Sequence, residues 1–430
     1  MKKTILLALC FLLLLPVGCA GRGDPKQSET PSADSGDDDS TGYRFDYHYS
    51  AVAAFGSDTY VIETEDTVYY LCNNILYFSD KEYKEFIPLC PRPECDHKTS
   101  DCNAHIDPIG GFWIYDKYIY YASYDLGGKA PGDVPVKSAS LWRIRLDGTA
   151  HEQVLVFDPV DLGFTPKRTK WSFNFIADRI YVTFSAYRDQ TSLESSTAYG
   201  LVYLDELKLP EYKTNSEDEK DEESLGGVWL SSDGNLIYEL NTVNDGNTGD
   251  EPKYRLTQYD MDTDEYTVLA DLAIRPEYLD GGFMVYDDAF YYNSFDGVNV
   301  HLHKVDYGSD DITDKIIKEG PYNEVRIAYF DWKYGALIGH VKDPDGDPAK
   351  SGLYVYDTDL DLVDSLSYAG LPEDVMKISI FLQTDNYLFA ALPKDDNSIS
   401  CAYTIPTWYI DKSEIGTGNL AWRRWAPDGD

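Results

Sequence analysis

Apolar and polar residues along this chain form short alternating runs instead of following a helical period. The unit is clearest in residues 116–157, where runs at 116–121, 141–146 and 153–157 are rich in β-branched and aromatic residues. Runs of this kind, bounded by Asp, Gly and Pro, are typical of strands joined by tight turns. With a further run at 111–114, the stretch predicts a four-stranded antiparallel meander.

An apolar run closed by aspartate recurs seven times along the chain. These closing positions are Asp80, Asp147, Asp205, Asp260, Asp306, Asp357 and Asp411, and their intervals run from 46 residues (Asp260 to Asp306) to 67 residues (Asp80 to Asp147). Aspartate suits such a position because its side chain accepts backbone N–H groups of the turn that follows.

Seven copies at this spacing predict an all-β fold, a β-propeller of seven blades with four antiparallel strands each, over residues 43–425. A pair of irregular packed sheets is the alternative, but it has no reason to repeat seven times. No segment has a 3.6-residue apolar period, so we expect very little helix.

The first 42 residues have the composition of an export signal and a tether. Lys2 and Lys3 precede an apolar run at 5–15, too short to span a membrane, and Gly18 precedes Cys19. This resembles the bacterial lipoprotein processing site, which implies a signal peptide at 1–19, lipidation of Cys19 and anchoring at the outer face of the cell membrane. Pro16 stands where that family has Leu, so secretion with cleavage after Ala20 is the alternative.

The remaining segments outside the propeller are short. Residues 20–42 are rich in Gly, Ser, Asp and Pro and predict a flexible tether, and 426–430 form a C-terminal tail. The chain has 75 acidic and 37 basic residues, a formal charge of −38. Such a surface repels nucleic acid and anionic lipid headgroups. We therefore expect no nucleic-acid partner, contact with the membrane only through the lipid, and a monomer.

A compact cysteine cluster lies between the first two copies. Its members are Cys90, Cys95, His97 and Cys102, with the spacing C-x4-C-x-H-x4-C. Three thiols and one imidazole form the ligand set of a closed, structural zinc site. The alternatives are a disulfide, for which Cys72 or Cys401 would supply the additional thiol, and a catalytic cysteine.

The chain contains no recognisable catalytic motif, so the sequence predicts no catalytic residue. It lacks a phosphate-binding glycine loop, a G-x-S-x-G elbow and an H-E-x-x-H pair. The acidic turn at 343–347 lacks the downstream glutamate of a calcium loop, so calcium is not expected. His301 and His303 share one strand face, which allows a metal pair or two solvent-facing imidazoles.

Ligands of propellers usually bind near the axis, where the innermost strands lie. Four residues of the expected inner strands are therefore candidate ligand contacts: Trp113, Trp171, Trp229 and Arg326. The alternative for the tryptophans is packing between blades.

Two segments carry a family resemblance. The pattern from Tyr120 to Gly148 resembles propellers of the low-density-lipoprotein-receptor type and their bacterial relatives of unknown function, although their Tyr-Trp-Thr-Asp signature and six-blade count do not transfer. The segment at 88–104 is similar to one in lipid-anchored propeller proteins of Gram-positive gut bacteria. The resemblance implies a surface lipoprotein with a β-propeller and no established activity.

These observations favour a membrane-tethered binding or scaffold module without enzymatic activity. Its partner would be a peptide, a glycan or an envelope protein. The alternative is a carbohydrate-active enzyme, a hydrolase or lyase with a pair of carboxylates in the axial funnel.

Overall fold

The computed structural model of this chain describes residues 61–425 with internal gaps. The gaps are 83, 100, 110, 126–137, 177, 189–194, 215–228, 234–235, 244–252, 273–282, 287–288, 296–298, 308–311, 318–323, 332–335, 344, 372–379, 385 and 392–407. The predicted signal peptide, Cys19, the tether, the start of the propeller domain, Cys401 and the C-terminal tail lie outside the described residues, so those expectations stay predictions.

The fold consists of seven four-stranded sheets, each built from strands that follow one another in the chain. Blade 1 contains β1 (Val61–Glu63), β2 (Thr67–Cys72), β3 (Ile75–Asp80) and β4 (Phe86–Pro88). Blade 2 contains β5 (Phe112–Tyr115), β6 (Tyr118–Asp125), β7 (Ser138–Arg145) and β8 (Glu152–Phe157). Blade 3 contains β9 (Arg168–Ile176), β10 (Arg179–Tyr187), β11 (Ser195–Tyr203) and β12 (Lys213–Thr214). Blade 4 contains β13 (Trp229–Asp233), β14 (Leu236–Val243), β15 (Lys253–Asp260) and β16 (Glu265–Leu272).

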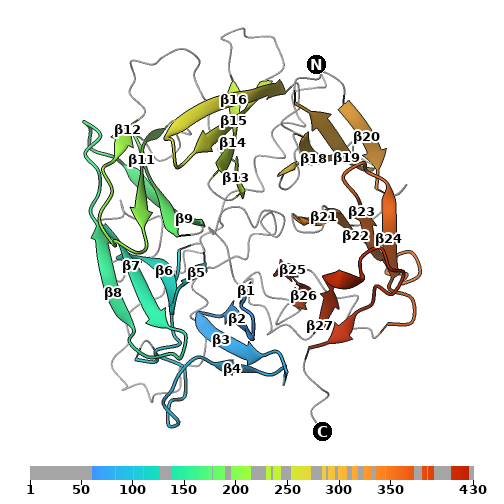
Figure 1. The fold of residues 1–430 in the computed structure, drawn as a ribbon, viewed down its shortest axis with the longest axis horizontal. Helices are drawn as coiled ribbons and strands as arrows, with labels where there is room; N and C mark the ends of the chain where they lie inside the picture. The colour runs from blue at the N-terminus through green and yellow to red at the C-terminus, as the bar shows by residue number, and fades with distance from the viewer. Residues whose placement is uncertain are drawn as a thin grey trace, which may run out of the picture. The chain divides into compact units, whose positions relative to one another are not determined.

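The last three blades repeat this order. Blade 5 contains β17 (Phe283–Tyr286), β18 (Ala289–Phe295), β19 (Val300–Asp306) and β20 (Ile312–Ile316). Blade 6 contains β21 (Glu324–Asp331), β22 (Ala336–Lys342), β23 (Gly352–Tyr356) and β24 (Leu362–Ser367). Blade 7 contains β25 (Ile380–Gln383), β26 (Tyr387–Ala391), β27 (Trp408–Asp411) and β28 (Arg423–Arg424). All pairs are antiparallel, and the sheets follow one another around a ring with the first strand of each innermost (Figure 1).

This arrangement confirms the predicted seven-bladed propeller. Each aspartate-closed run forms the third strand of a blade, and in five of the turns that follow, the aspartate accepts the N–H of the residue two positions on. These five pairs are Asp80 with Glu82, Asp147 with Thr149, Asp260 with Asp262, Asp357 with Asp359 and Asp411 with Ser413. The helix identified in the described part of the chain is one 3-10 turn, Lys412–Glu414.

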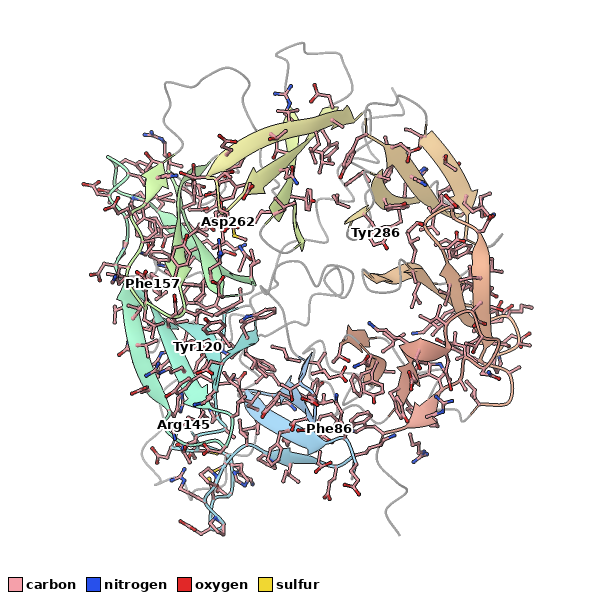
Figure 2. The ribbon with its side chains drawn as sticks, viewed as in Figure 1. Phe86, Tyr120, Arg145, Phe157, Asp262 and Tyr286 are labelled. Atoms are coloured by element: carbon pink, nitrogen blue, oxygen red, sulfur yellow. The ribbon has the colours of Figure 1, made fainter. Side chains whose placement is uncertain are left out.

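Side chains of one blade reach the turns of the next. Tyr69 on β2 donates to the Leu146 carbonyl at 3.4 Å, and Tyr291 on β18 donates to the Thr358 carbonyl at 3.0 Å. These two hydroxyls connect blade 1 to blade 2 and blade 5 to blade 6. A charged contact serves the same purpose between blades 3 and 4, where the Arg179 guanidinium lies 2.8 Å from Asp262, which Figure 2 labels.

The core lies between neighbouring blades. Phe157 at the end of β8 packs against Trp171 on β9, with 5.9 Å between ring centroids, and this contact joins blades 2 and 3. Both side chains are fully buried. Burying both faces of every sheet removes the apolar area that a lone meander would expose. A search of the described residues finds no helix of the length and hydropathy needed to cross a membrane.

Among the described residues blade 1 and blade 7 share no strand, and side-chain contacts join them. Trp425, fully buried, donates its indole N–H to Ser79 Oγ at 3.0 Å and stacks on Phe86 of blade 1 at 6.1 Å. Phe86 lies on the side of blade 1 that faces the red strands of blade 7 in Figure 2. Tyr387 and Phe389 of blade 7 meet the same indole edge-on at 5.2 and 4.9 Å. The first and last copies are therefore neighbours, as the repeat predicted.

Candidate metal centre

The cysteine cluster lies in the loop that leads from β4 of blade 1 to β5 of blade 2. The part of this loop that carries the cluster is held at both ends by Leu76, which accepts from the Leu89 N–H at 2.8 Å and donates its own N–H to the Ala104 carbonyl, also at 2.8 Å. Leu89 and Ala104 are buried in the core of blade 1. The loop is therefore closed at its base before any metal binds, which reduces the entropy lost on bringing the ligands together.

Short turns bring the four side chains to one place. The Cys95 N–H bonds to the Arg92 carbonyl at 3.2 Å and the Cys102 N–H to the Thr99 carbonyl at 2.9 Å. His97 adopts the left-handed region with φ of 62°, a conformation that is costly for a residue with a side chain. In this conformation the His97 imidazole reaches Cys102, with 3.4 Å between Nδ1 and Sγ.

The ligand atoms of Cys90, Cys95, His97 and Cys102 all lie within 4.8 Å of one another. Zinc bonds sulfur at about 2.3 Å and nitrogen at about 2.0–2.1 Å, so ligands of a tetrahedral site stand roughly 3.4–3.8 Å apart. Inward shifts of about 1 Å or less would complete such a site. The predicted ligand set is thus brought together, and it could hold a metal ion.

The disulfide alternative finds no support in the described residues. Cys72, Cys90, Cys95 and Cys102 form no disulfide bond. Cys72 is buried on β2 beside the Asn73 amide, which donates to its sulfur at 3.4 Å. The three cluster thiols instead face one imidazole, which is the arrangement expected of a metal site.

A positive charge that sequence reasoning did not single out lies beside the thiols. The Arg92 guanidinium is 3.6 Å from Cys95 Sγ and also bonds to the Asp101 carbonyl. Zn²⁺ with three thiolates carries one net negative charge, which this guanidinium offsets. The sequence does place an arginine between the first two cysteines. Whether its side chain turns toward the thiols depends on the fold of the loop.

The thiols differ in how their surroundings shift their pKa. Burial raises the pKa of Cys102 to about 11, and its two neighbouring thiols add to the rise. Burial also acts on Cys90, but hydrogen bonds from the backbone and side chain of Arg92 outweigh it and lower the pKa of that thiol. Of these two thiols, Cys90 is the one that more readily loses its proton to give the thiolate, the form that binds metal.

The loop also contacts blade 2. The Asn103 amide donates to the Gly148 carbonyl at 2.8 Å. Gly148 has φ of 76°, and a Cβ there would lie 2.6 Å from the Leu89 carbonyl oxygen, next to the first ligand, Cys90. A residue with a side chain fits neither the dihedral nor the space. Gly148 thus allows blade 2 to contact the loop that carries the cysteine cluster.

The four candidate ligand contacts all lie on innermost strands, as predicted: Trp113 on β5, Trp171 on β9, Trp229 on β13 and Arg326 on β21. Trp113 is half-buried against the core between blades 2 and 3. Trp171 is fully buried, and its ring lies 5.9 Å from that of Phe157 of blade 2. That is the between-blade packing given as the alternative, because an indole without exposed surface cannot stack on a ligand. The side chains of Trp229 and Arg326 lie outside the described residues.

One acidic side chain is described on the innermost strands, and it serves ring closure. Glu63 on β1 accepts hydrogen bonds from Asn386 and Thr384 of blade 7 and pairs with Lys81 at 2.5 Å. A carboxylate with these partners has few lone pairs left for a substrate. The acidic turn at 343–347 is also internally bonded, since Asp343 Oδ2 accepts the N–H groups of Asp345 and Asp347.

No protein-family model matches this sequence, and no curated protein matches it. Among solved structures the chain is similar to a prolyl endopeptidase, with 14% identity and a TM-score of 0.46 over 89% of this chain and 52% of that chain. It is also similar to an oligogalacturonate lyase from Vibrio parahaemolyticus (10%, 0.41, over 79% and 87%) and to a polysaccharide lyase (11%, 0.39, over 69% and 76%). The chain spans about half the length of the prolyl endopeptidase. At these values the similarities assign no activity, substrate or partner to this chain.

Proposed function

We propose that this chain is a zinc-stabilised β-propeller, held at the outer face of a cell membrane by a lipid on Cys19, that binds a peptide, a glycan or an envelope protein. The observation that carries the proposal is the convergence of three thiols and one imidazole at the junction of blades 1 and 2. Three thiolates and one imidazole fill a tetrahedral zinc ion, which leaves no position for a substrate. The metal therefore stiffens a scaffold and takes no part in a reaction.

Binding would use the centre of the ring. Trp113, Trp229 and Arg326 lie on the innermost strands. A formal charge of −38 favours basic or neutral partners over anionic ones. Loops held by a rigid scaffold are common positions for recognition.

The binding part of the proposal is tested with the full chain in detergent on arrays of peptides and glycans. We expect retention of one ligand class, with weaker retention by the Arg326→Ala variant. Arg255→Ala is the matched control, because Arg255 lies on β15, away from the innermost strand, and pairs with Asp271 at 2.8 Å. Cleavage of an arrayed glycan would contradict the proposal and favour the carbohydrate-active enzyme.

The anchoring part has its own test. Cys19→Ala should move the protein from the membrane fraction to the medium, because no other residue offers the processed thiol to a lipid. Cys10→Ala, within the apolar run at 5–15, is the control and should leave the protein in the membrane fraction. Equal membrane retention of Cys19→Ala and wild type would contradict lipid anchoring through this residue.

A further inference from the structure

Two histidines and one aspartate lie together on blade 5, outside the cysteine cluster. His301 and His303 stand two residues apart on β19, so both point to the same face of the sheet. Their rings are nearly parallel, with 5.9 Å between centroids and 9° between planes. Asp314 on the neighbouring strand β20 is the direct register partner of His303 and therefore lies on that face as well. Two adjacent strands thus place two imidazoles and one carboxylate together.

The Nδ1 atoms of both imidazoles face the Asp314 carboxylate. His301 Nδ1 lies 2.9 Å from Oδ1 and 3.1 Å from Oδ2, and His303 Nδ1 lies 3.7 Å from Oδ1. Ligands about 2.0–2.2 Å from a tetrahedral zinc ion stand roughly 3.4 Å apart. The distances between each imidazole nitrogen and the carboxylate lie on either side of that value.

His303 provides the observation that calls for a cation. Its Nε2 lies 2.6 Å from Ser294 Oγ on β18, whereas its Nδ1 is buried and makes no hydrogen bond. Nδ1 faces a carboxylate oxygen across 3.7 Å, beyond hydrogen-bond length. A buried nitrogen without a partner costs free energy. A cation bound by Nδ1 and the carboxylate removes that penalty.

The surroundings hold the His303 ring in one orientation. Tyr292 stacks on its ring with 4.4 Å between centroids and 17° between planes. A hydrogen bond between the other ring nitrogen and a fixed partner, here Ser294, is what orients metal-binding histidines in general.

We propose that His301, His303 and Asp314 bind one divalent transition-metal ion at the outer part of blade 5. Two imidazoles and one carboxylate leave at least one coordination position open for water or a ligand. The Asp314 side chain is 50% exposed, so an ion can reach the group from solvent. This site differs from the Cys90–Cys102 cluster, whose four ligands close it, and it is independent of the proposed binding function.

The same residues suggest one competing arrangement, in which His303 acts as the base of a Ser294 nucleophile oriented by Asp314. That arrangement needs a hydrogen bond from His303 Nδ1–H to the carboxylate. The observed separation of 3.7 Å exceeds hydrogen-bond length. The geometry therefore favours the metal, and the nucleophile becomes an outcome of the test.

The first test titrates the zinc-loaded full chain with Ni²⁺ in a calorimeter. We expect one Ni²⁺ to bind per chain, and His303→Gln and Asp314→Asn to weaken binding at least about tenfold. His151→Gln is the matched control, because His151 is also half-buried beside an aromatic ring but bonds only to Tyr121. Absence of Ni²⁺ binding, or equal binding by His303→Gln and wild type, would overturn the proposal.

A second measurement uses the unmodified protein, so it remains valid if a variant does not fold. Bound Ni²⁺ should protect His301 and His303 from diethylpyrocarbonate, mapped by mass spectrometry, and should leave the reactivity of His151 unchanged. Equal reactivity with and without Ni²⁺ would count against the site. Labelling of Ser294 by a fluorophosphonate in metal-free protein would assign the group to nucleophilic chemistry and overturn the metal site.

Discussion

Glu63 of the first blade and Asn386 of the last are hydrogen-bonded, with 2.8 Å between Oε1 and Nδ2, although 323 positions separate them in the chain. The same carboxylate accepts from Thr384 and lies 2.5 Å from Lys81 Nζ. Within residues 61–425, as far as the structure describes them, these blades share no strand. This polar group and the aromatic cluster around Trp425 therefore hold the ring closed in the described part of the chain.

Glu63 should make ring closure depend on pH. Burial raises the pKa of its carboxyl, but hydrogen bonds from Asn386, Lys81 and Thr384 outweigh burial and hold that pKa below the usual 4.5. The stabilisation is therefore complete above pH 4.5 and lost as the pH falls through the lower, folded-state value. Glu63→Gln should lower the free energy of unfolding at pH 7 by about 1–3 kcal/mol, and the difference from wild type should shrink below pH 4.5.

Chemical denaturation at several pH values measures this difference. Glu206→Gln is the matched control, because Glu206 pairs with Lys208 at an exposed position. If the free energies of unfolding of Glu63→Gln and wild type differ by the same amount from pH 7 to pH 3, the charge of Glu63 does not stabilise the closed ring.

Of the described side chains that join blades 1 and 7, Trp425 should contribute most to the free energy of unfolding. It is fully buried, its indole N–H bonds to Ser79, and rings from both end blades surround it. Trp425→Ala should reduce the free energy of unfolding by about 3–5 kcal/mol, as for other buried aromatic residues. Leu209→Ala, 55% exposed, is the control and should have little effect. A loss below about 1 kcal/mol for Trp425→Ala would mean that other contacts close the ring.

Gly148 and Gly163 form a matched pair for the junction of blades 1 and 2. Both have positive φ, 76° and 78°, but a Cβ at Gly148 meets the Leu89 carbonyl at 2.6 Å and one at Gly163 meets nothing within 4 Å. Gly163→Ala should cost only the dihedral penalty, about 1–2 kcal/mol. Gly148→Ala should cost more and also weaken zinc binding, because Leu89 precedes Cys90. Thermal unfolding measures the loss of stability, and a competitive zinc titration measures the loss of zinc affinity. Equal effects of the two variants would disprove that Gly148 is needed for the contact with Leu89.

The purified full chain should contain about one zinc ion, as expected for one closed four-ligand site. Cys95→Ser should lose most of it, and removal of zinc by a chelator should lower the unfolding temperature, because binding energy to a folded site is folding energy. Cys72→Ala is the control: it removes a buried thiol outside the cluster and should keep the zinc. Elemental analysis that finds no metal, with the cluster thiols oxidised, would exclude the site.

The sequence by itself determined the type and number of blades. Alternating apolar residues and an aspartate at the end of each third strand are local signals, because the side-chain period of a strand and the bonding of an aspartate to its own turn involve neighbours in the chain. Those signals predicted seven four-stranded sheets, and all seven aspartates follow or close a third strand. The cysteine spacing was local in the same way and identified four side chains that lie together and could hold a metal ion.

Only the tertiary structure decided the contacts between blades. The direction of an innermost side chain depends on how the next blade packs, and this is why Trp171 lies in the core and not in the centre of the ring. The bond from Glu63 to Asn386, the position of Gly148 against Leu89, and the approach of Asp314 to His303 each join residues whose proximity depends on strand register or ring closure. Periodicity reports which residues are buried, but it carries no information about the surface that covers them.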